Sequence, residues 1–227
     1  MSIHQILKNT SYHLDLFSES EIEEFEKTIM TRQANGKTTF YVRCLIRDKD
    51  IKLKPEEVVR QLYLRRLLKV YGYPKNRIAV EFSVSFGSEK KFADIVILDK
   101  DHPTSAYIIV ELKKPKWKEG KDQLKSYCHA TGAPIGVWTN GGQISYYHRK
   151  DPNYFEDLTD IPKAKQTLAD IISERFTIAD LITNDKLTTE KKSLKDIVLA
   201  MEDEVLANAG VDVFEEVFKL IFTKLYD

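Results

Sequence analysis

The chain has 227 residues, of which 42% are hydrophobic and 31% are charged, a composition that suits a globular protein with a substantial core. Its 35 Lys and Arg residues balance 35 Asp and Glu residues, so any affinity for nucleic acid must come from local clusters of charge. The sequence has no apolar run close to the roughly 20 residues of a membrane span, and its N-terminus lacks the pattern of a leader sequence. The spacing of Cys44 and Cys128 does not predict a zinc site or a disulfide framework. We therefore expect a cytoplasmic protein with no membrane partner.

Residues 1–37 are predicted to form a helical lead-in. An acid-rich helix is expected over residues 12–33, where Ser18 can cap the helix and acidic side chains favour its N-terminal end. Residues 38–46 are rich in β-branched and aromatic side chains and predict a strand. The core of the fold is expected to begin with that strand.

A helix is predicted to begin at Pro55, because proline is favoured at the first helical position and two acidic residues follow it. The helix has a broad apolar face, and Gly72-Tyr73-Pro74 predicts its end. Three strands are predicted next, over residues 77–86, 91–98 and 106–112. A Gly-Ser-Glu-Lys turn joins the first two as a hairpin, and the third (AYIIVEL) is as apolar as a central strand buried on both faces.

A helix over residues 121–131 and strands over 135–139 and 143–148 complete this region. The order of helix, three strands, helix and two strands predicts an α/β fold with a mixed central sheet flanked by helices. Residues 38–150 are therefore expected to form the core domain.

Beyond the core, residues 151–188 are predicted to be a helical extension and linker, with short helices over 162–174 and 177–183. Residues 189–227 are strongly helical in pattern and carry an apolar stripe that needs a partner. The pattern stops at the last residue, which favours a fragment of a longer polypeptide. The alternative is a C-terminal helical hairpin that folds back on the core.

Glu111 and Lys113 are the first candidates for catalysis. They lie two residues apart at the end of the apolar strand, so their side chains point to the same face, and burying them there is costly unless they are paired or used. Asp94 lies in the preceding strand, on the expected face of Val96 and Leu98. If the two strands pair, Asp94 approaches Glu111.

The sequence predicts a site of hard oxygen ligands, made of the carboxylates of Asp94 and Glu111 near the main-chain carbonyl of Leu112. Such a site suits Mg²⁺, for which Mn²⁺ can substitute. A metal there lowers the pKa of a bound water and neutralises charge on a scissile phosphate, while Lys113 orients the water or stabilises the transition state. The structural alternative is that Asp94 caps a turn and that Glu111 and Lys113 form an exposed pair.

Two pairs of residues at helical i, i+4 spacing add to this pattern. Glu56 and Arg60 share one face of the helix that precedes the sheet. Arg60 is expected to form an ion pair with Glu56, and Glu56 would either stay in that pair or reach the outer shell of the metal. Gln123 and Tyr127 share a face of the later helix, where they are either solvated or position a phosphate or the catalytic lysine.

A lysine-rich loop directly follows the predicted metal site, where a DNA backbone would lie. Lysine-rich loops are usually only solvated, but the position of this loop beside the predicted metal site makes its lysines candidates for phosphate contacts. The candidate DNA-binding residues are Lys114, Lys116, Lys118 and Lys121.

The runs KPEEVVRQ, YGYP, KKFADIVI, YIIVELKKP, QLKSY and GVWTNG occur in this order over about residues 40–150. Together they resemble the N-terminal nuclease domain of type I restriction enzyme R subunits, which has a PD-(D/E)xK restriction-endonuclease-like core. The resemblance implies that Asp94 is the first metal-binding acid and that Glu111 and Lys113 are the ExK pair. It also assigns Glu56 as the acid of the leading helix and Gln123 and Tyr127 as the QxxxY motif.

The tail from residue 193 resembles the start of the helical N-terminal region of type I-style N6-adenine DNA methyltransferases. This implies a fused restriction–modification enzyme, with methyltransferase and target-recognition parts in the same polypeptide or complex. The sequence contains no GxxxxGK[ST] loop, no NPPY-type motif and no AdoMet-binding glycines. Neither ATP nor S-adenosylmethionine is therefore expected to bind this fragment.

These observations predict a Mg²⁺-dependent restriction endonuclease domain that hydrolyses phosphodiester bonds of double-stranded DNA and that is weak or inactive in isolation. The first rival is a catalytically idle DNA-binding or assembly module with the same fold. The second is a repair or junction-resolving nuclease of the same superfamily, against which the methyltransferase-like tail argues.

Overall fold

The computed structural model describes residues 2–34, 36–113, 120–151 and 154–172. The chain divides into two compact units, residues 1–185 and 186–227, and all the described residues belong to the first. The predictions for residues 173–227, which include the second short helix, the linker and the methyltransferase-like tail, lie outside the described residues.

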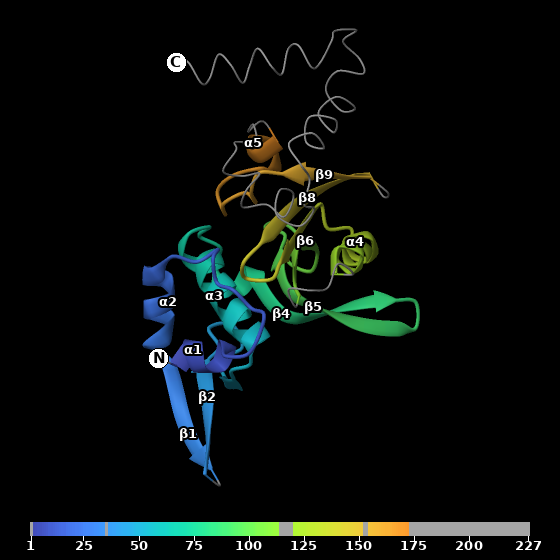
Figure 1. The fold of residues 1–227 in the computed structure, drawn as a ribbon. Coiled ribbons are helices and arrows are strands. Elements are labelled where there is room, and N and C mark those ends of the chain that lie inside the picture. Colours follow the sequence, from blue (N-terminus) through green and yellow to red (C-terminus); the bar gives the residue numbers. More distant parts are fainter. Residues whose placement is uncertain (1, 35, 114–119, 152–153, 173–227) are drawn as a thin grey trace, which may run out of the picture. The chain divides into compact units, whose positions relative to one another are not determined.

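Single helices separate groups of three strands along most of the described chain (Figure 1). In chain order they are α1 (Ser2–Leu7), α2 (Glu19–Glu26), β1 (Ile29–Ala34), β2 (Lys37–Arg43), β3 (Asp50–Lys52), α3 (Pro55–Lys69), a 3₁₀ turn (Lys75–Arg77), β4 (Ile78–Phe86), β5 (Glu89–Leu98), β6 (Ala106–Leu112), α4 (Gly120–Thr131), β7 (Ile135–Thr139), β8 (Ile144–Asp151), β9 (Tyr154–Leu158) and α5 (Leu168–Ile172).

The central feature is a six-stranded sheet in the order β4-β5-β6-β7-β8-β9. Strands β6 and β7 are parallel and are connected through α4, whereas the other neighbouring strands are antiparallel. The sheet is therefore mixed, and the predicted α/β fold is confirmed. A parallel pair needs a crossover connection, and α4 supplies it.

Helices α3 and α4 cover opposite faces of this sheet (Figure 1). Ile95 and Ile97 of β5 pack in the core on the α3 face, whereas Val96 packs in the core on the α4 face. This alternation is what a strand between two helical layers requires. Each fully buried aliphatic side chain of this kind stabilises the fold by about 1.5–3 kcal/mol.

Helix α3 begins and ends where the sequence predicts. Pro55 occupies its first turn, and Lys54 precedes it without a side-chain cap. Gly72 follows the helix with a φ of 73°, a backbone conformation that glycine adopts without strain. Nine residues of the helix are buried, so its position under the sheet is set by packing on several sides.

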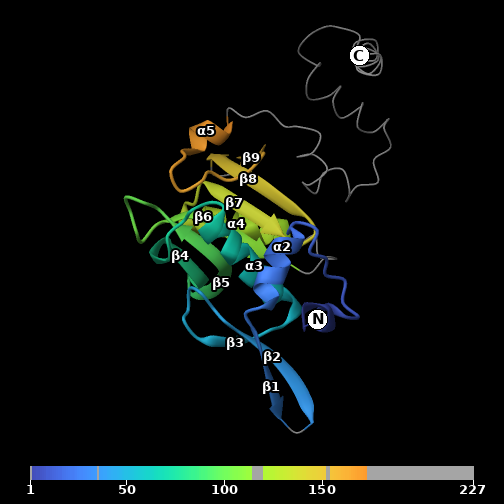
Figure 2. The same ribbon diagram turned by 90° about the vertical axis from the view of Figure 1, so that its left-hand side faces the viewer.

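The N-terminal prediction is correct only in part. Ser18 caps α2 with a reciprocal capping box to Glu21, as expected of a helix N-terminus. The helix predicted over residues 12–33 is nevertheless wrong at both ends, because α2 spans only Glu19–Glu26. Residues 29–34 form strand β1 and pair antiparallel with β2 in a separate sheet of order β1-β2-β3 (Figure 2). Pairing with β2 supplies main-chain hydrogen bonds that local sequence does not reveal.

The sheet also continues past the predicted end of the core at residue 150. Strand β9, which the sequence did not predict, pairs antiparallel with β8 at the edge of the sheet. Its sequence, YFEDL, is short and has two acidic residues among five, so only the neighbouring strand identifies it as β structure. Helix α5 lies inside the range predicted for the first short helix.

Cys44 and Cys128 are both buried and free. Within the described part of the chain, no helix has both the length and the apolar character to cross a membrane.

Candidate active site

The two predicted carboxylates meet at one end of the paired strands β5 and β6. The strands are antiparallel with Ile95 opposite Val110, so Asp94 and Glu111 occupy the next pair of positions. The main-chain amide of Leu112 donates a hydrogen bond of 2.7 Å to Asp94 Oδ2, which ties this carboxylate to β6. The structure therefore brings Asp94 next to Glu111, as strand pairing predicted.

Lys113 completes the group. Its ammonium nitrogen lies 2.7 Å from Glu111 Oε1, and its main-chain amide donates a hydrogen bond of 3.0 Å to the carbonyl of Thr139 at the end of β7. Glu111 is only 1% exposed, and its second oxygen, Oε2, is buried and has no hydrogen-bond partner in the described part of the chain. A buried carboxylate oxygen without a donor is costly, so a cation or a hydrogen-bond donor placed there would be strongly stabilised.

The charges of these side chains are coupled. Burial, followed by the negative charge of Asp94, raises the pKa of Glu111 to about 7 against the opposing effect of Lys113. Burial alone would lower the pKa of the Lys113 ammonium, but the hydrogen bond and charge of Glu111, together with Asp94, raise it above its ordinary value. Lys113 is therefore a cation at neutral pH in the metal-free protein, and Glu111 gives up its proton reluctantly.

Helix α3 contributes Arg60 and Glu56 to the same region. Arg60 Nη2 lies 3.2 Å from Glu56 Oε1 and 2.6 Å from Asp94 Oδ1, while Arg60 Nη1 contacts Glu57. The ion pair expected between Arg60 and Glu56 is present, and the contact with Asp94 is additional. Glu56 is a half-exposed carboxylate. Burial and the charge of Asp94 raise its pKa, so Glu56 and Asp94 interact electrostatically.

The predicted face of Asp94 is wrong. Val96 and Leu98 pack in the core on the α4 face, whereas Asp94 contacts α3 through Arg60. The cause lies on the neighbouring strand, where the pairing of β4 with β5 is interrupted at Glu81, the residue opposite Asp94. Glu81 has a φ of 55°, and a left-handed residue inside a strand breaks the simple alternation of its side chains.

Helix α4 supplies the predicted amide and phenol. Gln123 Nε2 donates a hydrogen bond of 2.6 Å to the hydroxyl of Tyr127, which in turn donates a longer one of 3.3 Å to the carbonyl of Phe92. Burial, then the charges of Glu111 and Asp94, raise the pKa of Tyr127 against the hydrogen bond from Gln123. The pair therefore lies beside the carboxylates, and it also fixes the backbone of β5 two residues before Asp94.

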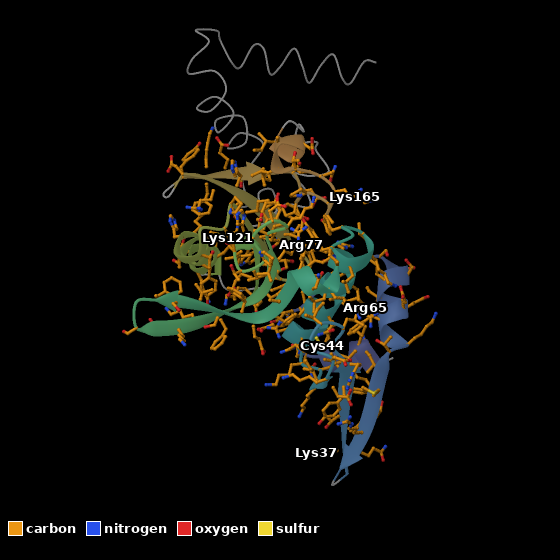
Figure 3. All side chains as sticks on the ribbon, turned by 180° about the vertical axis from the view of Figure 1, so that it is seen from behind. Lys37, Cys44, Arg65, Arg77, Lys121 and Lys165 are labelled. Atoms are coloured by element: carbon orange, nitrogen blue, oxygen red, sulfur yellow. The ribbon has the colours of Figure 1, made fainter. Side chains whose placement is uncertain are left out.

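Of the candidate DNA-binding lysines, the structure describes Lys121 alone. It lies near the N-terminal end of α4 (Figure 3), with its ammonium 5.3 Å from the centre of the Trp138 ring. Lys114, Lys116 and Lys118 lie outside the described residues, so their contacts with DNA stay a prediction.

Several residues near the site were not found by sequence reasoning. Gly120 begins α4 so close to the site that an added Cβ would meet Lys113 Cγ and would lie 2.7 Å from Trp138 Nε1. Tyr12 lines a pocket of about 830 Å³ together with Glu56 and Arg60, a size within the range of ligand-binding pockets. No local pattern marks these residues, because they reach the site only through the tertiary fold.

The described residues contain no ready cluster of three or more His, Cys, Asp or Glu side chains for a metal ion. The chemistry of the site nevertheless fits Mg²⁺, which binds proteins through one or two carboxylates and keeps several waters. Asp94 and Glu111 supply two carboxylates, the charge of Asp94 raises the pKa of Glu111, and Glu111 Oε2 has no hydrogen-bond partner among the described residues. A divalent cation would relieve both effects.

Comparison with known proteins agrees with this region of the chain. Residues 55–162 match the family model described as the type I restriction enzyme R protein N terminus. That span contains Glu56, Asp94, Glu111, Lys113, Gln123 and Tyr127. The match shows that this region is similar to the N terminus of type I restriction enzyme R proteins. No curated protein matches the chain.

Two solved structures are similar to parts of the chain. The type IIG restriction endonuclease BpuSI is 21% identical, with a TM-score of 0.35, over 51% of this chain and 14% of its own. A DUF820 protein from Anabaena variabilis ATCC 29413, described as a candidate nuclease, is 15% identical, with a TM-score of 0.36, over 70% of this chain and 96% of its own. The chain thus spans about one seventh of the length of BpuSI. Both TM-scores are too low for function to be inferred from either structure.

Proposed function

We propose that this chain carries the endonuclease domain of a restriction–modification enzyme and hydrolyses phosphodiester bonds of double-stranded DNA in a Mg²⁺-dependent reaction. The observation that supports this most is the convergence of Asp94, Glu111 and Lys113 where the pairing of β5 with β6 ends, inside the span that matches the restriction-enzyme family model. A methyltransferase-type continuation of the chain, as the tail resemblance implies, belongs to the same proposal.

Asp94 and Glu111 would hold one or two Mg²⁺ ions, with the carbonyl of Leu112 as a further ligand. Bound Mg²⁺ supplies charge neutralisation at the scissile phosphate and a lower pKa for a coordinated water. Arg60 and the amide of Leu112 hold the two oxygens of Asp94, so this carboxylate keeps its orientation before the metal binds. Mn²⁺ is expected to substitute.

Lys113 would act as a hydrogen-bond donor. Its raised pKa keeps the ammonium charged at neutral pH in the metal-free protein, and Glu111 holds it 2.7 Å away. From there it can donate to a phosphate oxygen or orient the attacking water, and its charge opposes the negative charge that grows in the transition state. Gln123 and Tyr127 would position the backbone of β5 beside this group.

Nicking of a supercoiled plasmid in Mg²⁺ or Mn²⁺ tests the proposal. Because the isolated domain is expected to be weak, conversion of plasmid to the nicked form is followed at high protein concentration, where the wild type should nick and Asp94→Ala and Lys113→Ala should not. Asp101→Ala and Lys100→Ala, which alter exposed residues in the loop after β5, are matched controls and should nick like the wild type. Equal nicking by the wild type and both active-site variants would refute the assignment.

One observation favours an idle DNA-binding or assembly module as a second candidate. Arg60 already neutralises Asp94 through a contact of 2.6 Å, and the Arg60 side chain is 8% exposed. If Arg60 has replaced the metal, calorimetric titration with Mg²⁺ or Mn²⁺ should show no binding that depends on Asp94 and Glu111. Under the endonuclease proposal, binding should be present in the wild type and lost in Asp94→Ala.

A further inference from the structure

The distal part of the β4–β5 hairpin forms a two-stranded arm. Pairing between β4 and β5 continues from Phe82 opposite Ala93 to Phe86 opposite Glu89, whereas β6 pairs with β5 only from Ile95 onward. Residues 82–93 therefore extend beyond the part of β5 that β6 covers, and Figure 1 shows the arm reaching away from the other strands of the sheet.

One face of the arm is packed against α4. Val84 is buried in the core on the α4 face, and Phe82 and Phe86 pack against that core. The ring of Phe86 lies 5.8 Å from the ring of Tyr127, whose hydroxyl donates to the carbonyl of Phe92. The packing and this hydrogen bond fix the arm relative to the candidate active site.

The opposite face of the arm is exposed to solvent. Ser83 lies opposite Phe92, and Ser85 lies opposite Lys90, so these four side chains share one face. All four residues are exposed, and Phe92, at 60%, has the largest exposed fraction among the exposed large hydrophobic residues of the described chain. Asp94 continues the same alternation along β5, so the exposed face leads directly to the candidate metal site.

A single exposed aromatic residue is ordinary on a protein surface, so the location of Phe92 carries the inference. Phe92 lies two residues from Asp94, and Lys90 lies four, which correspond to about 7 Å and about 14 Å along a strand. Each DNA strand carries one phosphate per about 3.4 Å of helix axis, so both side chains lie within a few base-pair steps of a phosphate held at Asp94.

The charges on this face also favour an anionic partner. Glu81, the acidic residue at the base of the arm, is ion-paired with Arg47 at 2.8 Å. Lys90 makes no ion pair within the described part of the chain, whereas the neighbouring Lys91 lies on the other face, 3.6 Å from Glu89 and over the ring of Phe86. The uncompensated charge on the exposed face is therefore positive.

We propose that this face (Ser83, Ser85, Lys90 and Phe92) binds the DNA backbone beside the scissile phosphate. Lys90 and the two serine hydroxyls donate to phosphate oxygens, and Phe92 packs against a deoxyribose. A two-stranded ribbon is narrow enough to lie against a DNA groove. The inference rests on the proposed function for its substrate, and it assigns to the arm the task of aligning one strand across Asp94.

Fluorescence anisotropy of a labelled DNA duplex, titrated with the full chain in EDTA at several NaCl concentrations, tests this assignment without any cleavage. Lys90→Glu should weaken binding about 10-fold and lower the slope of log affinity against log salt by about 1, as expected when one phosphate contact is lost. Lys91→Glu makes the same change of charge on the opposite face and should bind like the wild type. Phe92→Ser should weaken binding, whereas Tyr154→Ser, which removes another exposed aromatic residue, should not.

Equal effects of Lys90→Glu and Lys91→Glu would overturn the inference, because they would show that only long-range charge matters. Unchanged binding by Phe92→Ser would overturn the role of the aromatic ring. Plasmid nicking separates this outcome from the proposed function. If nicking depends on Asp94 but Lys90→Glu and Lys91→Glu bind DNA alike, the arm alone is removed. If DNA binding depends on Lys90 but calorimetry shows no Mg²⁺ or Mn²⁺ binding that depends on Asp94, the endonuclease is removed and the arm remains a DNA-binding surface.

Discussion

Replacing Glu111 by Gln should make the metal-free protein more stable at alkaline pH. The substitution keeps the shape of the side chain and its ability to accept a hydrogen bond from Lys113, but it removes the negative charge. In the wild type, that charge is buried beside Asp94, and one carboxylate oxygen of Glu111 has no hydrogen-bond partner among residues 2–34, 36–113, 120–151 and 154–172. The substitution should at the same time abolish metal binding and nicking, so stability and activity move in opposite directions.

The size of the effect follows from the pKa of Glu111, which is raised from 4.5 to about 7 in the folded protein. The folded carboxyl group holds its proton more tightly than the unfolded one, so its stabilising contribution is complete below pH 4.5 and is lost as the pH rises through 7. At about 1.4 kcal/mol per pKa unit, the loss is about 3 kcal/mol. For a chain of this size, such a difference shifts the melting temperature by roughly 6–12 °C.

The assay is denaturant unfolding in EDTA, followed by Trp fluorescence at pH 4.5 and pH 8. Wild type and Glu111→Gln should have similar free energies of unfolding at pH 4.5, and the variant should be more stable by up to about 3 kcal/mol at pH 8. Glu89→Gln, in an exposed carboxylate at the tip of the arm, should match the wild type at both values. If Glu111→Gln is less stable than the wild type at pH 8, the reasoning about this buried charge is refuted.

Two further substitutions test the neighbourhood of the site. Gly120→Ala would normally favour a helix, but here the added methyl group meets Lys113 and Trp138. Nicking should therefore fall at least about 10-fold, while the circular dichroism spectrum stays native. Wild-type nicking by this variant would show that Lys113 tolerates displacement. Glu81→Val should lower the free energy of unfolding by about 1–2 kcal/mol more than Glu81→Gly, because a β-branched residue is strained at a φ of 55° and glycine is not. Equal stability of the two variants in chemical denaturation would argue against strain at this position.

The candidate site could be assembled from the sequence because its parts lie on regular elements. Glu111 and Lys113 follow an apolar strand of unmistakable pattern, and Gln123 and Tyr127 share one face of a helix. Local spacing fixes which of these side chains lie together, since strands and helices have fixed periods. The resemblance to restriction-enzyme nuclease domains placed Asp94 and Glu56 with them, although each comes from a different element.

Other features could not be predicted, because they depend on contacts between distant segments. Strand β1 lies in a range that reads as helix, and β9 has almost no strand signal; both are strands because β2 and β8 offer them hydrogen bonds. The salt bridge from Arg60 to Asp94 joins residues 34 positions apart, so no helical or strand period reveals it.

The sequence by itself therefore determined the order of the elements from α3 to β8, the mixed character of the sheet and the identity of the charged residues at the site. Hydrophobic periodicity and turn residues encode these features locally. Only the tertiary structure decided that Asp94 turns toward α3, because that depends on the left-handed backbone of Glu81 on the adjacent strand. It alone also placed the unpartnered oxygen of Glu111 and the exposed arm beside the site, since burial and exposure are properties of the packed chain and of no single segment.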